Sequence, residues 1–315
     1  MQRTRTRICV IGGAGFIGTH VTRQLVDAGR DVIVLGRRAV PVGHLPPTVT
    51  YVSGDYGDRE VLKDVLRGVD ELVDLAYATV PQTSFADPIF DILANLPPSV
   101  QLLQEAAVAK VRKVVLVSSG GTVYGNAKSL PIDEEHPTFP ISPYGITKLT
   151  IEKYAGMFHQ VADLPVVIAR PGNAYGEGQR AFAGQGFIAT AVHSIISGET
   201  IRIFGAEGTI RDYLHVSDIA SGIVAALDCG EPGNAYNIGS SIGRSNLDVL
   251  REIEPLATRA GYSLRTETIP ARRFDVPANV LDSRKLAAVS GWRPQIGFAS
   301  GIERVWEAVS RSHRR

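Results

Sequence analysis

The stretch "VIGGAGFIGTH" (residues 10–20) joins a short apolar run to an amphipathic segment. Its glycines recur every third residue. Glycine lets the chain turn sharply and lets the backbone approach a pyrophosphate, which then lies at the positive N-terminus of a helix. An ordinary strand-to-helix turn can also be rich in glycine, but this turn lies between a predicted strand and a predicted helix, close to the N-terminus. We therefore predict a dinucleotide site at Gly12, Gly15, Phe16, Ile17 and Gly18.

The rest of the first half alternates short β-branched runs with longer amphipathic ones. The runs have no polar face, which is typical of parallel strands that are covered on both sides by helices. Repeated βαβ units of this kind give a doubly wound parallel sheet, so the fold class is α/β. We expect strands at 7–12, 31–36, 49–55, 71–77, 113–119 and 164–172, and helices at 16–29, 59–68, 98–111 and 143–160.

The pattern changes at about residue 174, where a glycine-rich loop precedes short strands and helices. We expect a dinucleotide-binding domain made of residues 1–173 and 212–239. Residues 174–211 and 240–315 are expected to form a smaller α/β lobe that binds the substrate.

Composition excludes several classes of protein. The 315 residues carry a net charge of +1, which gives no reason to expect nucleic acid or an anionic membrane as a partner. No apolar stretch is long enough to cross a bilayer. The two cysteines, Cys9 and Cys229, are far apart and indicate neither a disulfide framework nor a metal site. We expect a cytoplasmic protein without a metal.

The end of the second strand bears on the choice of cofactor. An acidic residue usually stands there and binds the ribose hydroxyls of NAD, but this chain has Gly36, followed by Arg37 and Arg38. The two guanidinium groups could bind the 2′-phosphate of NADP, or they could be ordinary solvated charges. NAD and NADP both remain open, with a lean toward NADP. Asp55 and the Tyr56 backbone, after the third strand, are candidates for binding adenine.

A tyrosine and a lysine lie four residues apart in "SPYGITK" (residues 142–148), at the start of a helix. This spacing puts Tyr144 and Lys148 on one helix face. A tyrosine is a poor base at neutral pH, but a nearby ammonium group and the positive charge of a nicotinamide ring would favour its phenolate. We predict that Tyr144 is an acid/base and that Lys148 is its partner, which also holds the nicotinamide ribose.

Together, these motifs resemble those of the extended short-chain dehydrogenase/reductase family, and especially its UDP-galactose 4-epimerase-like members. The resemblance extends over nearly the whole chain. It rests on "GGAGFIG", "VSSGGTVYG", "SPYGITK", "RPGNAYG" and "RDYLHVSDIA". It implies a Rossmann domain with a small lobe that binds a nucleotide sugar.

The resemblance also assigns roles to further residues. It implies that Asn95 supports the site from behind and that Ala76 and Pro171 border the cofactor. The diphosphate would be bound by arginines, and the nucleotide would lie against an apolar wall. The implied substrate-binding residues are Asn173, Phe187, Ile203, Phe204, Arg211, Arg272 and Asp275.

The chain departs from the family pattern in "VSSGGTVYG" (residues 117–125). The family usually has a catalytic Ser or Thr four residues before the tyrosine of this motif, and here that position is Gly120. Ser119, Thr122 or a water molecule would then have to hold the substrate oxygen. Room left by Gly120 and Gly121 would suit a larger sugar, such as an N-acetylated hexose.

The favoured activity is 4-epimerisation of a nucleotide sugar, because it needs no acid or base beyond Tyr144. A dehydratase would need an Asp-Glu pair where Gly121 and Thr122 stand. An NADPH-dependent 4-keto-sugar reductase is the main alternative, and a non-catalytic sensor of NAD(P) is the second. The resemblance further implies a homodimer formed through the helices that contain residues 98–110 and 142–158.

Overall fold

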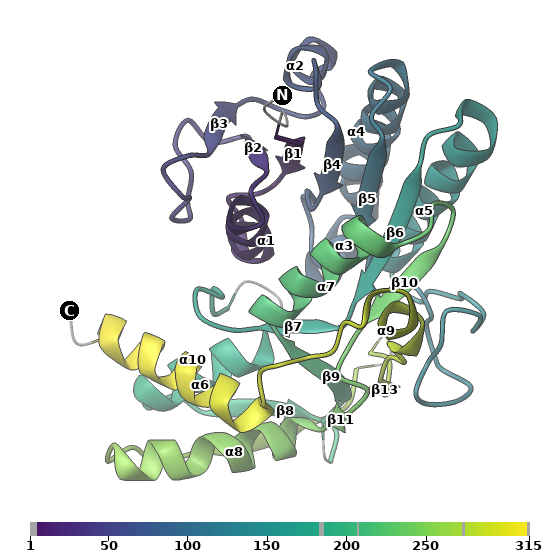
Figure 1. Cartoon of the computed structure of the whole chain (residues 1–315). Helices are drawn as coiled ribbons and strands as arrows, with labels where there is room; N and C mark the ends of the chain where they lie inside the picture. Colours follow the sequence, from purple (N-terminus) through teal and green to yellow (C-terminus); the bar gives the residue numbers. More distant parts are fainter. Residues whose placement is uncertain (1–4, 183–185, 207, 273–274, 314–315) are drawn as a thin grey trace.

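A large parallel sheet forms the centre of the molecule (Figure 1). The computed structural model describes residues 5–182, 186–206, 208–272 and 275–313. Within them, the strand order is β10-β6-β5-β4-β1-β2-β3, and every pairing is parallel. The strands are β1 (Arg7–Ile11), β2 (Asp31–Gly36), β3 (Thr50–Ser53), β4 (Glu71–Asp74), β5 (Lys113–Val117), β6 (Val166–Pro171) and β10 (Ala235–Ile238).

The direction of winding reverses between β1 and β4, so the strand ends open a crevice there, where ligands bind in such sheets. Helices cover both faces, as the unbroken apolar strands require. One face packs against α2 (Arg59–Val65), α4 (Pro88–Val108) and α5 (Pro143–Ala162); the other packs against α1 (Phe16–Asp27) and α7 (Val216–Cys229). The predicted doubly wound α/β fold is confirmed.

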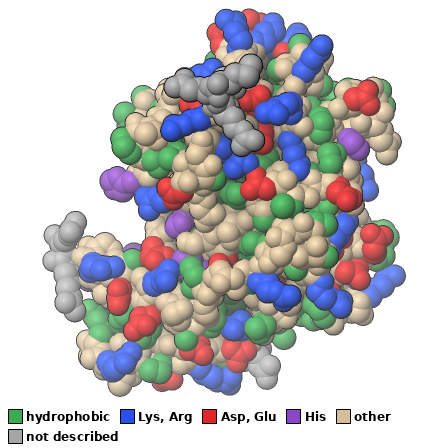
Figure 2. Space-filling model, viewed as in Figure 1, with side chains coloured by type: hydrophobic (Ala, Val, Ile, Leu, Met, Phe, Trp, Pro, Cys, Tyr) green, Lys and Arg blue, Asp and Glu red, His purple; other side chains and the backbone are tan. Residues whose placement is uncertain are grey.

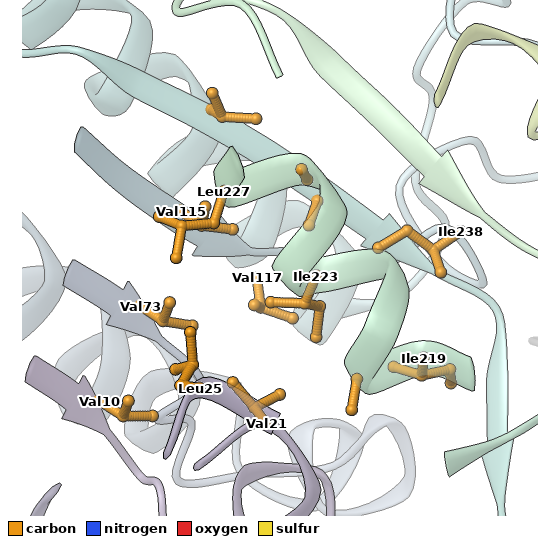
Figure 3. Packing of buried hydrophobic residues seen from close by; sticks show 14 of the residues in the cluster. Val10, Val21, Leu25, Val73, Val115, Val117, Ile219, Ile223, Leu227 and Ile238 are labelled. Carbon is orange, nitrogen blue, oxygen red and sulfur yellow. The ribbon is translucent and has the colours of Figure 1, made fainter. Parts of the chain in front are cut away.

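The core between the sheet and α7 is entirely apolar (Figure 3). Ile219, Ile223 and Leu227 follow one another at helical spacing on α7, and Figure 3 shows Leu227 beside Val115 and Ile223 beside Val117 of β5. Burying a side chain of this size contributes about 1.5–3 kcal/mol. This packing holds β5 in place against α7, and therefore fixes the positions of the residues that follow the strand.

A smaller lobe lies beyond the carboxyl ends of the strands (Figure 1). Its core combines α6 (Phe187–Ile196), α8 (Asn246–Arg259) and α10 (Phe298–His313) with two small sheets. The strands of these sheets are β7 (Asn173–Tyr175), β8 (Ile201–Phe204), β9 (Ile210–His215), β11 (Gly243–Arg244), β12 (Thr266–Ile269) and β13 (Ala278–Asn279). Strand β9 is central because it pairs with β7, β11 and β13.

The expected division of the chain differs from the packing in one segment. Residues 240–315 were assigned to the small lobe, yet α9 (Arg284–Ser290) packs against α7 and β10. Leu286 and Trp292 belong to the core of the large domain, and the Trp292 indole donates a hydrogen bond to Ser221. Their apolar side chains complete the cover over α7, which the periodicity of the sequence did not indicate.

The helix before β5 is much longer than expected. The sequence predicted residues 98–111, but α4 begins at Pro88 and continues through Pro97 and Pro98. It starts at Asp87, whose carboxylate accepts a hydrogen bond from Phe90 N at 2.9 Å. A shorter helix, α3 (Pro81–Ala86), precedes it and was not predicted.

Acidic and basic side chains are interspersed on the face shown in Figure 2, as the net charge of +1 leads one to expect. In the described part of the chain, none of the helices has the length and apolar character needed to cross a membrane.

Candidate functional site

The glycine turn has the geometry of a phosphate cradle. Gly12 has φ +76°, and a Cβ on Gly18 would overlap the Gly12 carbonyl, so α1 approaches the turn more closely than any other residue would allow. Helix α1 begins at Phe16 with no side-chain cap, which leaves its first backbone N–H groups pointing into the crevice. These features fit a bound dinucleotide diphosphate.

A single cavity of about 1400 Å³ runs from this turn into the small lobe. Predicted cofactor residues line its first part: Gly12, Gly15, Phe16, Ile17, Gly18, Pro171, Tyr144 and Lys148. Ala76 does not line it but packs behind the turn, where its backbone N would lie 3.2 Å from a Cβ on Gly12. The cavity therefore connects the predicted dinucleotide site with the predicted substrate-binding lobe.

Tyr144 and Lys148 occupy the first turns of α5. Ser142 caps this helix by accepting a hydrogen bond from Gly145 N, and the Ser84 hydroxyl accepts one from Tyr144 N. Lys148 Nζ donates to the Val117 carbonyl at 2.8 Å, at the end of β5. The lysine is thus fixed at the edge of the sheet where the strands end.

Burial dominates the acid/base properties of both groups. It raises the pKa of Tyr144 above its usual value, and the negative charge of Asp91 raises it further. Burial lowers the pKa of Lys148 to about 8, although Asp74 opposes this shift. The phenol is therefore neutral at pH 7 in the protein alone, and additional positive charge is needed to make it a base.

Two neighbours of Lys148 were missed in the sequence. Lys148 Nζ lies 4.1 Å from the centroid of the Tyr77 ring, and that ring packs edge-on against Tyr144 at 4.7 Å. Asp74 is buried at the end of β4, and burial raises its pKa to about 6. Asp74 ends β4, the strand beside β1, and Tyr77 follows it, so their position at the carboxyl end of a central parallel strand was the signal that could have revealed them.

A buried polar network supports the site from behind. Asp91 accepts hydrogen bonds from the hydroxyls of Thr79 and Thr147, so it links the segment after β4 to α5. Asn95 accepts one from Ala78 N at 2.7 Å and donates to the Asp91 carbonyl. Asn95 is therefore part of the same buried network as Asp91.

The expectation that both glycines leave room for a substrate must be corrected. A Cβ on Gly120 would lie 2.5 Å from Leu281 Cδ1 and 2.8 Å from the Arg170 carbonyl, inside the protein and away from the cavity. A Cβ on Gly121 would instead face Asn173 and Ser119, and Gly121 lines the cavity. Gly121, rather than Gly120, leaves room for a substrate.

The two candidate hydroxyls differ in accessibility. Ser119 is half-buried and lines the cavity, and its hydroxyl has no hydrogen-bond partner among the described residues. Thr122 Oγ1 is fully buried and also lacks a partner within the described chain. Both residues line the cavity, but Thr122 Oγ1 is fully buried, so the Ser119 hydroxyl is the one that a ligand can reach directly.

The far end of the cavity collects the residues implied for the nucleotide. Arg211 on β9 and Arg272 line it with Phe187, Phe204 and Asp275, whereas Asn173 lines the cavity beside Gly121. Arg272 lies 4.0 Å from the centroid of the Phe204 ring and donates two hydrogen bonds to Asp275. Burial lowers the pKa of Arg211, and the positive charge of Arg272 lowers it further. A bound anion would offset both effects.

Ile203 was wrongly assigned to this wall. Side chains alternate along β8, so Arg202 and Phe204 line the cavity, whereas Ile203 points into the core of the small lobe with 2% exposure.

The residues expected at the adenosine end lie outside this cavity. Arg37, Arg38 and Asp55 are exposed, and Asp55 accepts a hydrogen bond from Gly57 N. Tyr56 is buried in the core on the α4 side of the sheet. No described contact ties either arginine to an acidic side chain.

The model of the NAD dependent epimerase/dehydratase family matches residues 8–239, more than two thirds of the sequence. The chain belongs to this family. A UDP-glucose 4-epimerase from Mycolicibacterium smegmatis is 31% identical over 96% of this chain and 97% of its own length.

Solved structures of the family agree. A UDP-glucose 4-epimerase from Thermotoga maritima, solved with UDP-glucose, has a TM-score of 0.91 at 29% identity and covers 98% of this chain and 99% of its own. A dTDP-glucose 4,6-dehydratase from Streptomyces venezuelae, solved with NAD bound, has a TM-score of 0.86 at 31% identity, with 98% of each chain covered. The predicted family, the Rossmann-like fold and the assignment to a family of nucleotide-sugar enzymes are confirmed.

Proposed function

We propose that this protein is a nucleotide-sugar 4-epimerase that acts on a UDP-hexose or a UDP-N-acetylhexosamine through a transient 4-keto sugar. One observation carries the proposal: a single cavity joins the glycine turn, the Tyr144–Lys148 pair and the Arg211–Arg272 end. Ligands bound along it would bring the nicotinamide half of a dinucleotide next to the sugar of a nucleotide sugar whose diphosphate lies at the arginines.

A nicotinamide held beside Tyr144 and Lys148 would supply the hydride acceptor and donor that epimerisation needs. Tyr144 takes the proton from the sugar hydroxyl and later gives one back. Lys148, held by the Val117 carbonyl, would bind the nicotinamide ribose, and it lies one helical turn from Tyr144. Its charge offsets part of the effect of burial on the Tyr144 pKa.

Ser119 is the group that we propose holds the reacting sugar oxygen. Its hydroxyl is in the cavity and free to donate, unlike the enclosed Thr122 hydroxyl. The open space at Gly121 lets a sugar with a bulky substituent lie beside it.

At the other end, Arg211 and Arg272 would bind the diphosphate, since guanidinium groups match its charge and geometry. Phe187 and Phe204 would border the base. Asp275, which already orients Arg272, would accept a hydrogen bond from the nucleotide ribose.

The adenosine end accepts NADP in this proposal as well as NAD. The family is NAD-dependent and the S. venezuelae relative holds NAD. Gly36 supplies no carboxylate to repel a 2′-phosphate, and Arg37 and Arg38 follow it. Titration with both cofactors tests this point, and a clear preference for NAD would contradict the lean toward NADP.

Two other activities of the same site are distinguishable. A 4,6-dehydratase needs acidic groups beside the sugar, and Gly121 and Thr122 provide none. A 4-keto-sugar reductase would use the same Tyr144 and Lys148 and is favoured by the two arginines. It consumes NADPH stoichiometrically, whereas an epimerase works with a catalytic amount of cofactor.

The assembly that we propose is a homodimer in the cytoplasm. Helices α4 and α5 lie against each other and expose apolar side chains, among them Leu93, Met157 and Val161. Pairing these helices with those of a second copy would cover the side chains. The cysteines, Cys9 and Cys229, are both free thiols, which fits a reducing compartment.

The central test is interconversion of UDP-glucose and UDP-galactose with trace cofactor, for the natural chain and for Tyr144→Phe. The variant should lose about 10²–10⁴-fold in kcat, because the phenol proton is the one transferred. It should still bind NAD, which titration measures. Full activity in Tyr144→Phe would refute the assigned role. Steady loss of absorbance at 340 nm with a keto-sugar and NADPH, without epimerisation, would indicate the reductase.

A further inference from the structure

The space next to Gly36 is filled by a residue from the neighbouring strand. A Cβ on Gly36 would lie 2.8 Å from the Tyr51 hydroxyl and 3.3–3.4 Å from the edge of its ring. Tyr51 pairs with Val34 in the register of β2 and β3, so its side chain rises on the face that a side chain at position 36 would use. The Tyr51 hydroxyl therefore stands where a carboxylate at position 36 would begin.

The hydroxyl has a defined hydrogen-bonding state. It donates to the Arg38 carbonyl at 2.7 Å. Its proton is engaged there, so only its oxygen lone pairs remain for another partner. Tyr51 is only partly buried, and its ring packs on the apolar core beneath the glycine turn. The group is thus rigid, uncharged and accessible.

We propose that Tyr51 is the residue that determines recognition of the adenosine ribose. In a doubly wound sheet this ribose lies at the end of β2, where an acidic side chain normally accepts a hydrogen bond from its 2′-hydroxyl. Tyr51 Oη takes over this acceptor role without a negative charge. The hydrogen bond from Tyr51 Oη to the Arg38 carbonyl would also hold the backbone at Arg37 and Arg38 beside the ribose.

The absence of charge on Tyr51 Oη decides which group can be bound at the 2′ position of the adenosine ribose. A 2′-hydroxyl of NAD can donate to Tyr51 Oη, whereas a 2′-phosphate has no proton to donate at neutral pH and would turn to Arg37 and Arg38. A carboxylate would repel that phosphate, but a phenol does not. The inference rests on the dinucleotide part of the proposed function and is independent of the sugar and of the reaction.

The first test is titration calorimetry of Tyr51→Phe with NAD⁺ and with NADP⁺. Loss of one neutral hydrogen bond should weaken NAD⁺ binding roughly two- to tenfold. Binding of NADP⁺ should change by less than about twofold, because its phosphate does not use the hydroxyl. Tyr262→Phe, in the small lobe, is the matched control and should bind both cofactors as the natural chain does. Equal loss for both cofactors, or no loss for NAD⁺, would overturn the proposal.

The second test asks whether positions 36 and 51 share one space. Gly36→Asp should weaken NAD⁺ binding in the natural background, because the new side chain must displace the Tyr51 hydroxyl. In Tyr51→Phe, the same substitution should strengthen NAD⁺ binding and weaken NADP⁺ binding. An identical effect of Gly36→Asp on NAD⁺ in both backgrounds would contradict the shared space. A natural chain that binds neither cofactor would instead remove the proposed function itself.

Discussion

Ser119 and Thr122 both carry a hydroxyl at the end of β5, and their surroundings assign them different roles. The Ser119 hydroxyl faces the cavity, whereas Thr122 Oγ1 is enclosed without a partner in the described structure. Ser119→Ala should lower kcat by about 10²-fold, as loss of a donor aimed at a reacting oxygen does. Thr122→Val should leave kcat within about threefold and keep or raise stability, because it removes an unpaired buried hydroxyl. Initial rates of epimerisation and thermal melts measure both effects, and the reverse order of the rates would show that Thr122 holds the substrate.

Gly120 and Gly121 differ in the space that a side chain would find at each position. Gly120→Ser should destabilise the fold by about 1–3 kcal/mol, because its side chain would press on Leu281 and the Arg170 carbonyl. Gly121→Ser should stay within about 0.5 kcal/mol of the natural chain, since its side chain enters the cavity. It should instead raise KM for N-acetylated sugars. Chemical denaturation compares the two variants; a stable Gly120→Ser would refute this account of the packing.

The positions of single residues could be predicted where a motif fixes the backbone around them. The glycine turn, Tyr144 and Lys148 all line the cavity as expected. Gly120 and Ile203 were misjudged because which way a residue faces depends on strand alternation and on distant partners such as Leu281. Tyr51 was missed because its partner, Gly36, lies on another strand.

Strand β6 and helix α5 are joined by a buried ion pair behind the site. Arg170 donates to Glu152 through Nη2 at 2.6 Å and Nε at 3.1 Å, and its Nη1 donates to the Tyr124 hydroxyl. Glu152→Ala should cost about 3–5 kcal/mol, because it leaves a buried guanidinium group without its counter-charge. The double variant Glu152→Ala/Arg170→Met should recover part of that loss.

The exposed pair Arg67–Asp64 is the control for this prediction, and Asp64→Ala should cost less than about 1 kcal/mol. Thermal unfolding of the three variants gives the comparison. A small loss in Glu152→Ala would mean that water reaches Arg170.

Elements with strong periodicity were predictable and the others were not. Six strands of the large sheet follow from their apolar runs, which agree with their positions within a few residues, whereas β10 was not predicted. Helix α4 was cut short in the prediction, because two adjacent prolines are normally read as the beginning of a helix. Its first turns are stabilised by the Asp87 cap and by contacts with α5, neither of which a propensity scale records.

The molecule as a whole exposes an apolar stripe on α5, where Tyr154, Met157 and Val161 recur at helical spacing. If this face forms the proposed dimer, Met157→Glu/Val161→Glu should halve the mass in solution, because four charges would be buried in each dimer. Light scattering after size-exclusion chromatography measures the mass. Val289→Glu, on α9, is the control and should leave the mass unchanged. A natural chain that is already monomeric would refute the dimer.

The division into two lobes was only partly visible in the sequence. The small-lobe core was expected from the change of pattern near residue 174. The return of α9 and Trp292 to the large domain was not, because a short amphipathic segment does not reveal which core it joins.

One long-range contact completes the strand end that carries Ser119. Asn279 donates a hydrogen bond to the Gly120 carbonyl, and Leu281 packs against the same glycine, across 159 residues of chain in the first case. The strand end that carries Ser119 is therefore closed by a segment that leaves the ribosome late. A nascent chain can assemble most of its sheet long before it can acquire a finished catalytic centre. We therefore expect a chain that ends before Asn279 to lack the contacts that fix the strand end at Gly120, and with them the turnover.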